Sequence, residues 1–227
     1  MSGLQRSRSA AALLFLLAVA CNAAFAQHTF AQHDHHFRDA ERWAQVFDNP
    51  ERDAWQRPDE VIAALKLPAD AIVADVGAGT GYFAVRLARA VPQGRVYAVD
   101  LEPEMVTHLE QRAKEEELTH LHAVLAMPDD AQLPEPVDAV LLVNTYHHIG
   151  ERTAYFRALA KSIKPDGRLA VIDFRMDSPI GPPRSGRIDA QQAITELGAA
   201  GYRVVERHDF LPHQYFVVLQ PLTGATP

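Results

Sequence analysis

A glycine-rich turn between an apolar strand and an amphipathic helix constrains this chain more than any other feature. Residues 72–76 (Ile-Val-Ala-Asp-Val) are apolar apart from one acid, Gly77, Gly79 and Gly81 follow, and helical spacing resumes at residues 82–90. Glycine lets the backbone bend sharply and approach a ligand closely, and the first N–H groups of a helix have no partner inside it. The pattern predicts a ligand cradle at this turn.

Strand-like and helix-like segments alternate along most of the chain, which indicates an α/β fold with a parallel sheet. Residues 211–214 are too few for a crossover, so the last two strands should form an antiparallel hairpin. Residues 53–58 are expected to connect two helices, and residues 176–185, rich in Pro and Gly, to form a lid or substrate loop. Strands are predicted at residues 72–76, 95–100, 121–127, 137–144, 168–174, 204–210 and 215–219, and helices at 37–47, 58–65, 82–90, 102–117, 152–163 and 188–200.

The first 26 residues have the composition of a cleaved export signal. Arg6 and Arg8 precede an apolar run at residues 10–20, and an Ala-Phe-Ala motif ends at Ala26. This run is too short to cross a bilayer, which takes about 20 residues. The sequence predicts export to a bacterial periplasm with cleavage after Ala26. The alternative is a lipoprotein in which Cys21 is lipidated and becomes the first residue.

Charge and cysteine content exclude several function classes. The 227 residues carry a formal net charge of −7, whereas broad nucleic-acid binding needs a basic face. Cleavage after Ala26 would leave no cysteine, which excludes disulfides, thiol catalysis and thiolate metal sites. The histidines at positions 28, 33, 35 and 36 fit a polar tail, and a zinc or copper site is the alternative. We predict no nucleic-acid partner, no stable membrane span and no metal site, and the oligomeric state stays open.

The acid beside the turn narrows the choice of ligand. Dinucleotide sites carry Gly-x-Gly-x-x-Gly, in which the second glycine makes room for a pyrophosphate. Here the glycines are at 77, 79 and 81, and Asp75 lies two residues before the first. A carboxylate at this place repels a pyrophosphate and suits a cationic ligand. The spacing therefore disfavours a nicotinamide-dependent oxidoreductase.

With five motifs in order along residues 58–219, the chain resembles the class I S-adenosylmethionine-dependent methyltransferases, and the glycine turn resembles their motif I. The resemblance implies a Rossmann-like seven-stranded, mostly parallel sheet with an antiparallel terminal hairpin and helices on both faces. It implies a methyltransferase domain at residues 58–220, a His-rich tail and accessory helix at 27–57, and a C-terminal tail at 221–227. Within the family, the chain is similar to the small-molecule enzymes that methylate carbon in quinone biosynthesis.

The resemblance also implies roles for individual residues. An acid at the end of the second strand holds both ribose hydroxyls, and Asp100 stands there. The loop after the third strand flanks the adenine, where Asp129 is favoured over Asp130. The fourth strand carries an acid, matched by Asp138, and leads to the reaction centre at Asn144; a Lys-Pro-Asp-Gly turn at 164–167 matches the one before the fifth strand. The implied cofactor-binding residues are Asp75, Gly77, Ala78, Gly79, Gly81, Asp100, Leu101, Met127, Asp129 and Asn144.

Catalytic candidates follow the fourth strand, where the carboxyl edge of the sheet opens. Methyl transfer needs aligned reactants, exclusion of water and, for a nucleophile that carries a proton, a base. An imidazole titrates near neutral pH, and adjacent histidines cannot face the same way, so His147 is favoured as the base and Tyr146 as a second candidate. The alternative is that these histidines only hydrogen-bond to the loop. Tyr215, His213 and Arg187 are expected to line an acceptor pocket.

The sequence therefore predicts an S-adenosylmethionine-dependent methyltransferase for an unidentified small-molecule acceptor. Asn144 is followed by Thr-Tyr-His instead of the Pro-Pro-Tyr of amine methyltransferases, which disfavours methylation of a nucleobase or glutamine nitrogen. The alternative is an exported, non-catalytic protein that binds S-adenosylmethionine or another nucleoside. Export supports this alternative, because S-adenosylmethionine is made in the cytosol.

Overall fold

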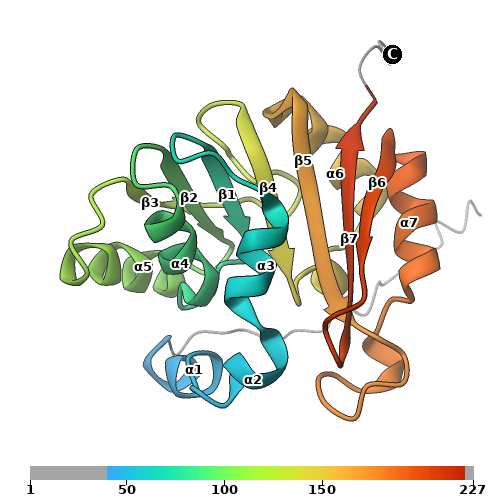
Figure 1. Cartoon of the computed structure of the whole chain (residues 1–227), viewed down its shortest axis with the longest axis horizontal. Coiled ribbons are helices and arrows are strands. Elements are labelled where there is room, and N and C mark those ends of the chain that lie inside the picture. Colours follow the sequence, from blue (N-terminus) through green and yellow to red (C-terminus); the bar gives the residue numbers. More distant parts are fainter. Residues whose placement is uncertain (1–39, 223–227) are drawn as a thin grey trace, which may run out of the picture. The chain divides into compact units, whose positions relative to one another are not determined.

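A seven-stranded sheet forms the centre of the described structure. The computed structural model describes residues 40–222, so the predicted export signal, the histidine-rich tail and residues 223–227 lie outside it. The strand order is β3-β2-β1-β4-β5-β7-β6, and only β7 runs antiparallel to its neighbours (Figure 1). The strands are β1 (Ile72–Val76), β2 (Arg95–Asp100), β3 (Leu121–Leu125), β4 (Val137–Val143), β5 (Ile163–Phe174), β6 (Tyr202–His208) and β7 (Gln214–Pro221).

Helices cover both faces of this sheet. One face packs on α3, α4 and α5 through a core that includes Val61, Leu87 and Leu109, and the other packs on α6 and α7 through Phe156 and Leu197. The predicted Rossmann-like sheet, with its antiparallel terminal hairpin and two helical layers, is therefore confirmed. The helices are α1 (Ala40–Phe47), α2 (Arg52–Gln56), α3 (Pro58–Leu65), α4 (Tyr82–Ala90), α5 (Pro103–Glu115), α6 (Arg152–Leu159) and α7 (Ala190–Ala199), with 3₁₀ turns η1 (Tyr146–His148), η2 (Ala160–Ser162) and η3 (Arg184–Gly186).

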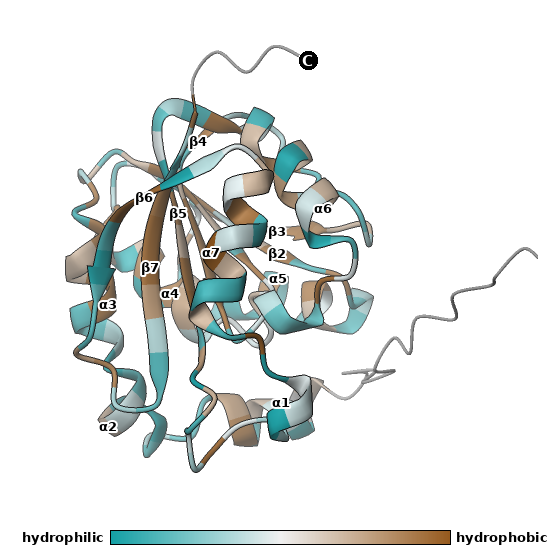
Figure 2. Ribbon diagram, turned by 90° about the vertical axis from the view of Figure 1, so that its right-hand side faces the viewer, coloured by the Kyte–Doolittle hydropathy of each residue, from teal (hydrophilic) through white to brown (hydrophobic). Residues whose placement is uncertain are grey.

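The alternation of side chains along a strand explains why both faces are apolar. In β5, Ala170 and Ile172 enter the core under α3 and α4, whereas Leu169 and Val171 enter the core under α6 and α7. A strand buried on both faces reads as a continuous apolar run. Figure 2 shows hydrophobic residues concentrated in the strands and hydrophilic residues on the helices and loops.

Several predicted boundaries differ from the structure, among them those of β6, which spans Tyr202–His208 instead of 204–210, and the three that follow. Residues 52–56, predicted as part of a connector, form α2. β5 begins at Ile163 and includes the predicted turn at 164–167, because its pairing with β4 jumps from Ile163 to Arg168 across a bulge. β3 ends at Leu125, two residues early, because the next residues turn back in a short bridge between Met127 and Asp130.

The carboxyl ends of the parallel strands meet at one edge of the sheet, and α1 and α2 lie beside this edge (Figure 1). Residues 40–57, expected as an accessory segment, are bonded to the rest of this unit. Gln56 Nε2 donates to Gln214 Oε1 at 2.9 Å, and Arg57 donates to the carbonyl oxygen of Phe210 at 2.6 Å. Within residues 40–222, no helix combines the length and the apolar content needed to cross a bilayer.

Candidate functional site

The glycine turn uses its backbone N–H groups inside the protein. Gly77 and Ala78 both donate to the carbonyl oxygen of Val99, at 2.8 and 3.0 Å. Gly79 donates to Asp100 Oδ2 at 2.8 Å. A pyrophosphate site needs free N–H groups that point at the ligand. The turn therefore does not form the anion cradle of a dinucleotide site, in agreement with the argument from Asp75 and the glycine spacing.

The same turn packs against two other segments, the end of α1 and the loop after β4. All three of its glycines have positive φ, a backbone conformation that strains any other residue. A Cβ atom on Gly77 would lie 2.3 Å from Thr145 Oγ1, and one on Gly79 would lie 3.4 Å from the ring of Phe47. The Cβ side of Gly77 is thus filled by the loop after β4 instead of facing a ligand. This contact joins the turn to the segment that carries His147.

Asp100 ends β2, and its carboxylate organises the neighbouring backbone. Besides the bond from Gly79 to Oδ2, the Oδ1 atom accepts the N–H of Glu102, the residue before α5, at 3.0 Å. Burial raises the pKa of Asp100. Each carboxylate oxygen can accept more than one hydrogen bond, so two vicinal hydroxyls can still bind.

Apolar side chains surround Asp100 without being buried. Leu101, Leu125 and Met127 are 48%, 48% and 55% exposed. Leu101 follows Asp100 in the chain, and Leu125 pairs with Asp100 between β2 and β3. Exposed apolar side chains that gather in one place mark a binding surface. A flat nucleobase next to a ribose held by Asp100 would cover this surface.

The loop after β3 separates the roles of its two acids. Asp130 is used in the loop itself, since its Oδ1 accepts the N–H of Gln132 at 2.8 Å and its backbone bridges to Met127. The carboxylate of Asp129 is exposed and has no hydrogen bond within residues 40–222. Asp129 is therefore the acid that is free to reach an adenine amine, as the sequence favoured.

A buried carboxylate and a partly buried cation interact electrostatically beside the turn. Asp75 is 3% exposed, and its Oδ2 has no hydrogen-bond partner among the described residues. Burial raises the pKa of Asp75 to about 7, and the positive charge of Arg52 opposes this shift. Arg52 donates to the carbonyl oxygen of Phe47 at 2.9 Å and lies 3.9 Å from the ring centre of Tyr82. Burial lowers the pKa of Arg52.

This pair suits the charged end of an amino acid, which carries one ammonium and one carboxylate. Asp75, Arg52 and Asp100 together fit S-adenosylmethionine, which combines an amino acid end, a sulfonium and a nucleoside. The sequence missed Arg52, because this residue lies in no recognisable motif between the first two predicted helices. A search for cations in the segment before motif I could have found it.

A histidine–carboxylate dyad lies at the end of β4 and β5. His147 Nδ1 is 2.9 Å from both oxygens of Asp173, and the backbone N–H of His147 donates to Oδ2 at 3.1 Å. Asp173 is 1% exposed and also accepts the N–H of Phe174 at 2.7 Å. A carboxylate only accepts hydrogen bonds, so the proton sits on Nδ1 and Nε2 is left to take a proton. The sequence missed Asp173, since an acid at a strand end has no signature without its partner.

The other residues after β4 have structural contacts. Tyr146, the second catalytic candidate, is fully buried against Phe156 and donates to Glu196 Oε2 at 2.8 Å. Burial and the Glu196 hydrogen bond raise the pKa of Tyr146, so its hydroxyl stays protonated and bound within the core. His148 stacks on His147 with ring centres 4.1 Å apart. The structure leaves His147 as the candidate base.

Asn144 and Asp138, the two polar residues of β4 that the resemblance singled out, lie at opposite ends of the strand. Asn144 adopts φ 57° after the strand, and its Oδ1 accepts from Gln214 Nε2 at 2.6 Å. Asp138 accepts the N–H of Ile72 at 2.8 Å and pairs with Lys164, so it closes the amino edge of the sheet. Asn144 thus lies at the same edge of the sheet as His147, and Asp138 lies at the opposite edge.

Two of the residues expected around an acceptor have other partners. Arg187 donates to the carbonyl oxygens of Pro182, Arg175, Ser178 and Ile180, at 2.7 to 3.0 Å, and so closes the loop from 175 to 187. The ring of His213 lies 6.4 Å from that of Trp55. Tyr215 lines a cavity beside β5. Among residues 40–222, no three His, Cys, Asp or Glu side chains are grouped so that they could hold a metal ion.

Comparisons with known proteins agree with this geometry. Residues 73–167 match the family described as a methyltransferase domain. The 27-O-demethylrifamycin SV methyltransferase of Amycolatopsis mediterranei (strain S699) is 27% identical over 166 residues, which cover 72% of this chain and 59% of that protein. The ubiquinone biosynthesis O-methyltransferase of Xanthomonas axonopodis pv. citri (strain 306) is 34% identical over 111 residues, 48% of this chain and 46% of that protein.

The alignments thus span between about half and three fifths of the length of these two relatives. Among solved structures, an S-adenosylmethionine-dependent methyltransferase from Aquifex aeolicus superimposes with a TM-score of 0.75 at 25% identity, over 81% of this chain and 99% of that one. The glycine turn, the strand order and these likenesses agree on one family and on S-adenosylmethionine as its methyl donor. Together these findings support a class I S-adenosylmethionine-dependent methyltransferase, with the match to the family model at residues 73–167.

Proposed function

We propose that this protein transfers the methyl group of S-adenosylmethionine to a small-molecule acceptor. One observation carries the proposal: Thr145 fills the space against Gly77, and His147 follows Thr145 by two residues. The nucleoside site around Asp100 and the base at His147 are thereby held at one edge of the sheet. A protein that only binds a nucleoside has no use for a base that is oriented by a buried carboxylate.

Each part of the site has a distinct role in this proposal. The donor, when bound, supplies an electrophilic methyl group on a sulfonium. Asp100 would hold the ribose hydroxyls, and Leu101 and Met127 would pack on the adenine. Asp75 and Arg52 would bind the amino acid end, with the donor's ammonium against Asp75. Gly77, Ala78, Gly79, Gly81 and Asn144 shape the floor of this site, and Asp129 would reach the adenine amine.

His147 would act as the general base. Its Nε2 would take the proton of the acceptor as the acceptor atom bonds to the methyl carbon. The bond from that carbon to the donor's sulfur would break, so that S-adenosylhomocysteine leaves, and Asp173 would stabilise the imidazolium that forms. The ubiquinone biosynthesis relative is an O-methyltransferase by name, and the name of the other relative gives a substrate that lacks a methyl group on an oxygen. Both names support a hydroxyl as the acceptor group. An acidic carbon, as in the quinone-biosynthesis subgroup, would need the same base, so the position of a labelled methyl group in the product decides between them.

Calorimetry with S-adenosylmethionine and S-adenosylhomocysteine tests the binding half of the proposal. We expect both to bind with dissociation constants below about 1 mM, that is, with more than about 4 kcal/mol. Absence of binding by either would refute the assignment. Transfer of a labelled methyl group to small molecules extracted from the source cell tests the catalytic half. Binding without transfer would favour the exported, non-catalytic alternative.

We further propose that the chain is exported, on the evidence of its first 26 residues. Mass spectrometry of the mature N-terminus separates the three forms: cleavage after Ala26, a lipidated Cys21, or an uncleaved Met1. An exported enzyme would need a supply of S-adenosylmethionine outside the cytosol. Detection of the uncleaved form in the cytosol would contradict export and remove that requirement.

A further inference from the structure

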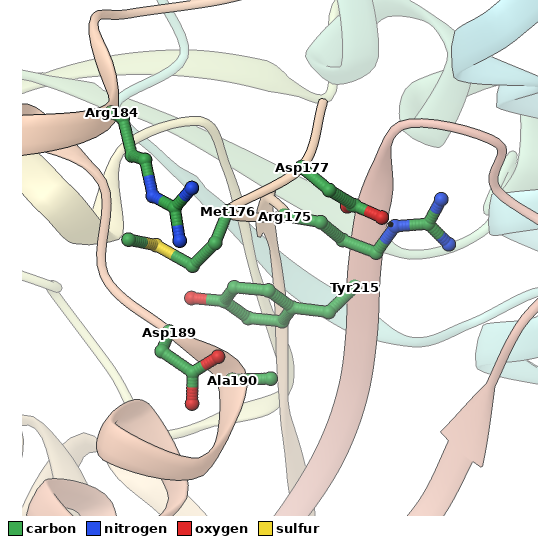
Figure 3. A pocket seen from close by; sticks show the side chains of 7 residues that line it. All are labelled: Arg175, Met176, Asp177, Arg184, Asp189, Ala190 and Tyr215. Carbon is green, nitrogen blue, oxygen red and sulfur yellow. Dashed lines mark ion pairs between the residues drawn. The ribbon is translucent and has the colours of Figure 1, made fainter. Parts of the chain in front are cut away.

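A cavity of about 310 Å³ opens beside Tyr215, next to the end of β5. The loop after β5, the start of α7 and the first part of β7 line it, and Figure 3 shows its side chains. Tyr215 of β7 is the direct partner of Asp173 in the sheet, and directly opposed residues point to the same face. The cavity therefore adjoins the carboxylate that orients His147.

The hydroxyl of Tyr215 is the unusual group in this cavity. Tyr215 is 7% exposed, and its oxygen has no hydrogen-bond partner among the described residues. A buried hydroxyl without a partner is costly, so structures retain few of them. In Figure 3 the hydroxyl points toward the side of the cavity lined by Met176, Arg184 and Asp189. Met176 is flexible, so its side chain can move aside for a ligand.

The charges around the cavity indicate what kind of group would bind there. Its lining includes two cations, Arg175 and Arg184, and two acids, Asp177 and Asp189, so the lining has no net charge. Burial, and then the negative charge of Asp173, raise the pKa of Tyr215, and Asp189 acts in the same direction. The hydroxyl therefore stays protonated and can donate, and Asp173 and Asp189 would repel a carboxylate placed against its oxygen. An uncharged oxygen can accept its hydrogen bond without the repulsion that a carboxylate would meet.

We propose that this cavity is the acceptor subsite, in which the Tyr215 hydroxyl donates a hydrogen bond to an uncharged oxygen of the methyl acceptor. The group to be methylated would face His147, and a carbonyl or hydroxyl oxygen at the other end of the acceptor would bind Tyr215. Arg184 makes no side-chain hydrogen bond or ion pair within residues 40–222 and borders the same opening, where it offers a second donor. The inference rests on the proposed methyltransferase function.

Three phenols that differ at one position test the proposal. 4-Hydroxybenzaldehyde carries an uncharged oxygen, 4-hydroxybenzoate a carboxylate and 4-methylphenol no second oxygen. We expect ligand-observed NMR, with S-adenosylhomocysteine present, to show the aldehyde binding about 3- to 10-fold more tightly than 4-methylphenol, the effect of one hydrogen bond. The carboxylate should bind no better than 4-methylphenol. Tyr215→Phe should remove the preference for the aldehyde.

Tyr202→Phe is the matched control. Tyr202 is also buried under α6 and α7, but its hydroxyl donates to the carbonyl oxygen of Phe156 at 2.9 Å. We expect Tyr202→Phe to lower the Tm and to leave the binding of the phenols unchanged. Tyr215→Phe should keep or raise the Tm, because it removes a hydroxyl that lacks a partner.

Three results would overturn the subsite: binding of none of the phenols, tightest binding of the carboxylate, or a lower Tm for Tyr215→Phe with unchanged preference for the aldehyde. Binding of S-adenosylhomocysteine to the same samples separates this failure from failure of the proposed function. If it binds while the phenols do not, only the subsite is refuted.

Discussion

Two buried carboxylates at the same edge of the sheet are held in opposite ways. Asp173 ends β5 and accepts hydrogen bonds from His147 Nδ1, from the His147 backbone and from Phe174. Asp75 in β1 is buried to nearly the same extent, yet one of its oxygens has no partner, and burial raises its pKa to about 7. The protein itself supplies the hydrogen-bond donors for Asp173, whereas it leaves one oxygen of Asp75 without a donor.

The difference matches two tasks. A carboxylate that orients a base must be fixed before the acceptor arrives, so its hydrogen bonds come from the protein. A carboxylate that binds a cationic methyl donor gains its missing partner when the methyl donor binds. Without the methyl donor, the burial of this carboxylate destabilises the folded protein. We expect substitutions on the Asp173 side to act mainly on folding and base orientation, and those on the Asp75 side to act mainly on donor binding.

Asp173→Ala should have the largest effect. It would leave three buried N–H groups without an acceptor, so we expect the free energy of unfolding in urea to fall by about 3–5 kcal/mol. Asp177→Ala, in the exposed loop three residues after the end of β5, is the control and should change the free energy of unfolding by less than about 0.5 kcal/mol. Equal effects of the two substitutions would show that Asp173 is not the organising group.

Asp75→Asn should stabilise the protein in a pH-dependent way. The pKa of Asp75 is raised from 3.8 to about 7 in the folded protein. Below about pH 4 the carboxyl is protonated in both states, and as the pH rises to 7 the unfolded state loses the proton more readily, so wild-type stability falls. We expect the free energy of unfolding of Asp75→Asn to exceed that of the wild type by about 2–4 kcal/mol at pH 8 and by much less at pH 4.5. A gap that does not change between these pH values would contradict the raised pKa.

Asp100→Ala should weaken donor binding more than folding. Loss of charge-assisted hydrogen bonds to the ribose should cost about 1.5–3 kcal/mol of S-adenosylhomocysteine affinity, which calorimetry measures directly. Asp100→Asn keeps one accepting oxygen for Gly79 or Glu102 and should lose less affinity. Asp59→Ala, on the exposed surface of α3, should leave the affinity unchanged. Unchanged affinity for Asp100→Ala would remove this residue from the site.

Asp129→Ala should have the smallest effect, and its comparison with Asp130→Ala tests which of the two acids contacts the adenine. We expect Asp129→Ala to weaken S-adenosylhomocysteine binding by about 0.5–1.5 kcal/mol, the value of one hydrogen bond. Asp130→Ala should leave the affinity unchanged, because the Asp130 carboxylate is bonded to the N–H of Gln132. The reverse result would assign the adenine contact to Asp130.

More of the site around Asp75 than of the site around Asp173 could be predicted from the sequence. The turn at Gly77 to Gly81 and the acid at Asp100 are local patterns, since a strand, its turn and the next helix are contiguous. The partners of the buried charges are not local. Asp173 lies 26 residues from His147, and Arg52 reaches Asp75 from another segment, so neither pair has a spacing that a single sequence reveals.

The same limit explains α2. Residues 52–56 have no apolar periodicity of their own, and tertiary contacts hold them as a helix, among them the bond from Gln56 to Gln214, 158 residues away. Local propensity is a weak guide for so short a segment, because tertiary context overrides it. The hairpin of β6 and β7 was predictable, because the short link between them allows no other pairing.

The position of β7 governs when the protein can finish folding during its synthesis. β7 follows all the other described strands in the chain, yet it pairs between β5 and β6. Until residues 214–221 are available, β5 keeps an open edge, Tyr215 cannot lie opposite Asp173, and Gln214 cannot join Gln56 to Asn144. The proposed reaction centre is therefore incomplete until β7 has been made and has paired with β5.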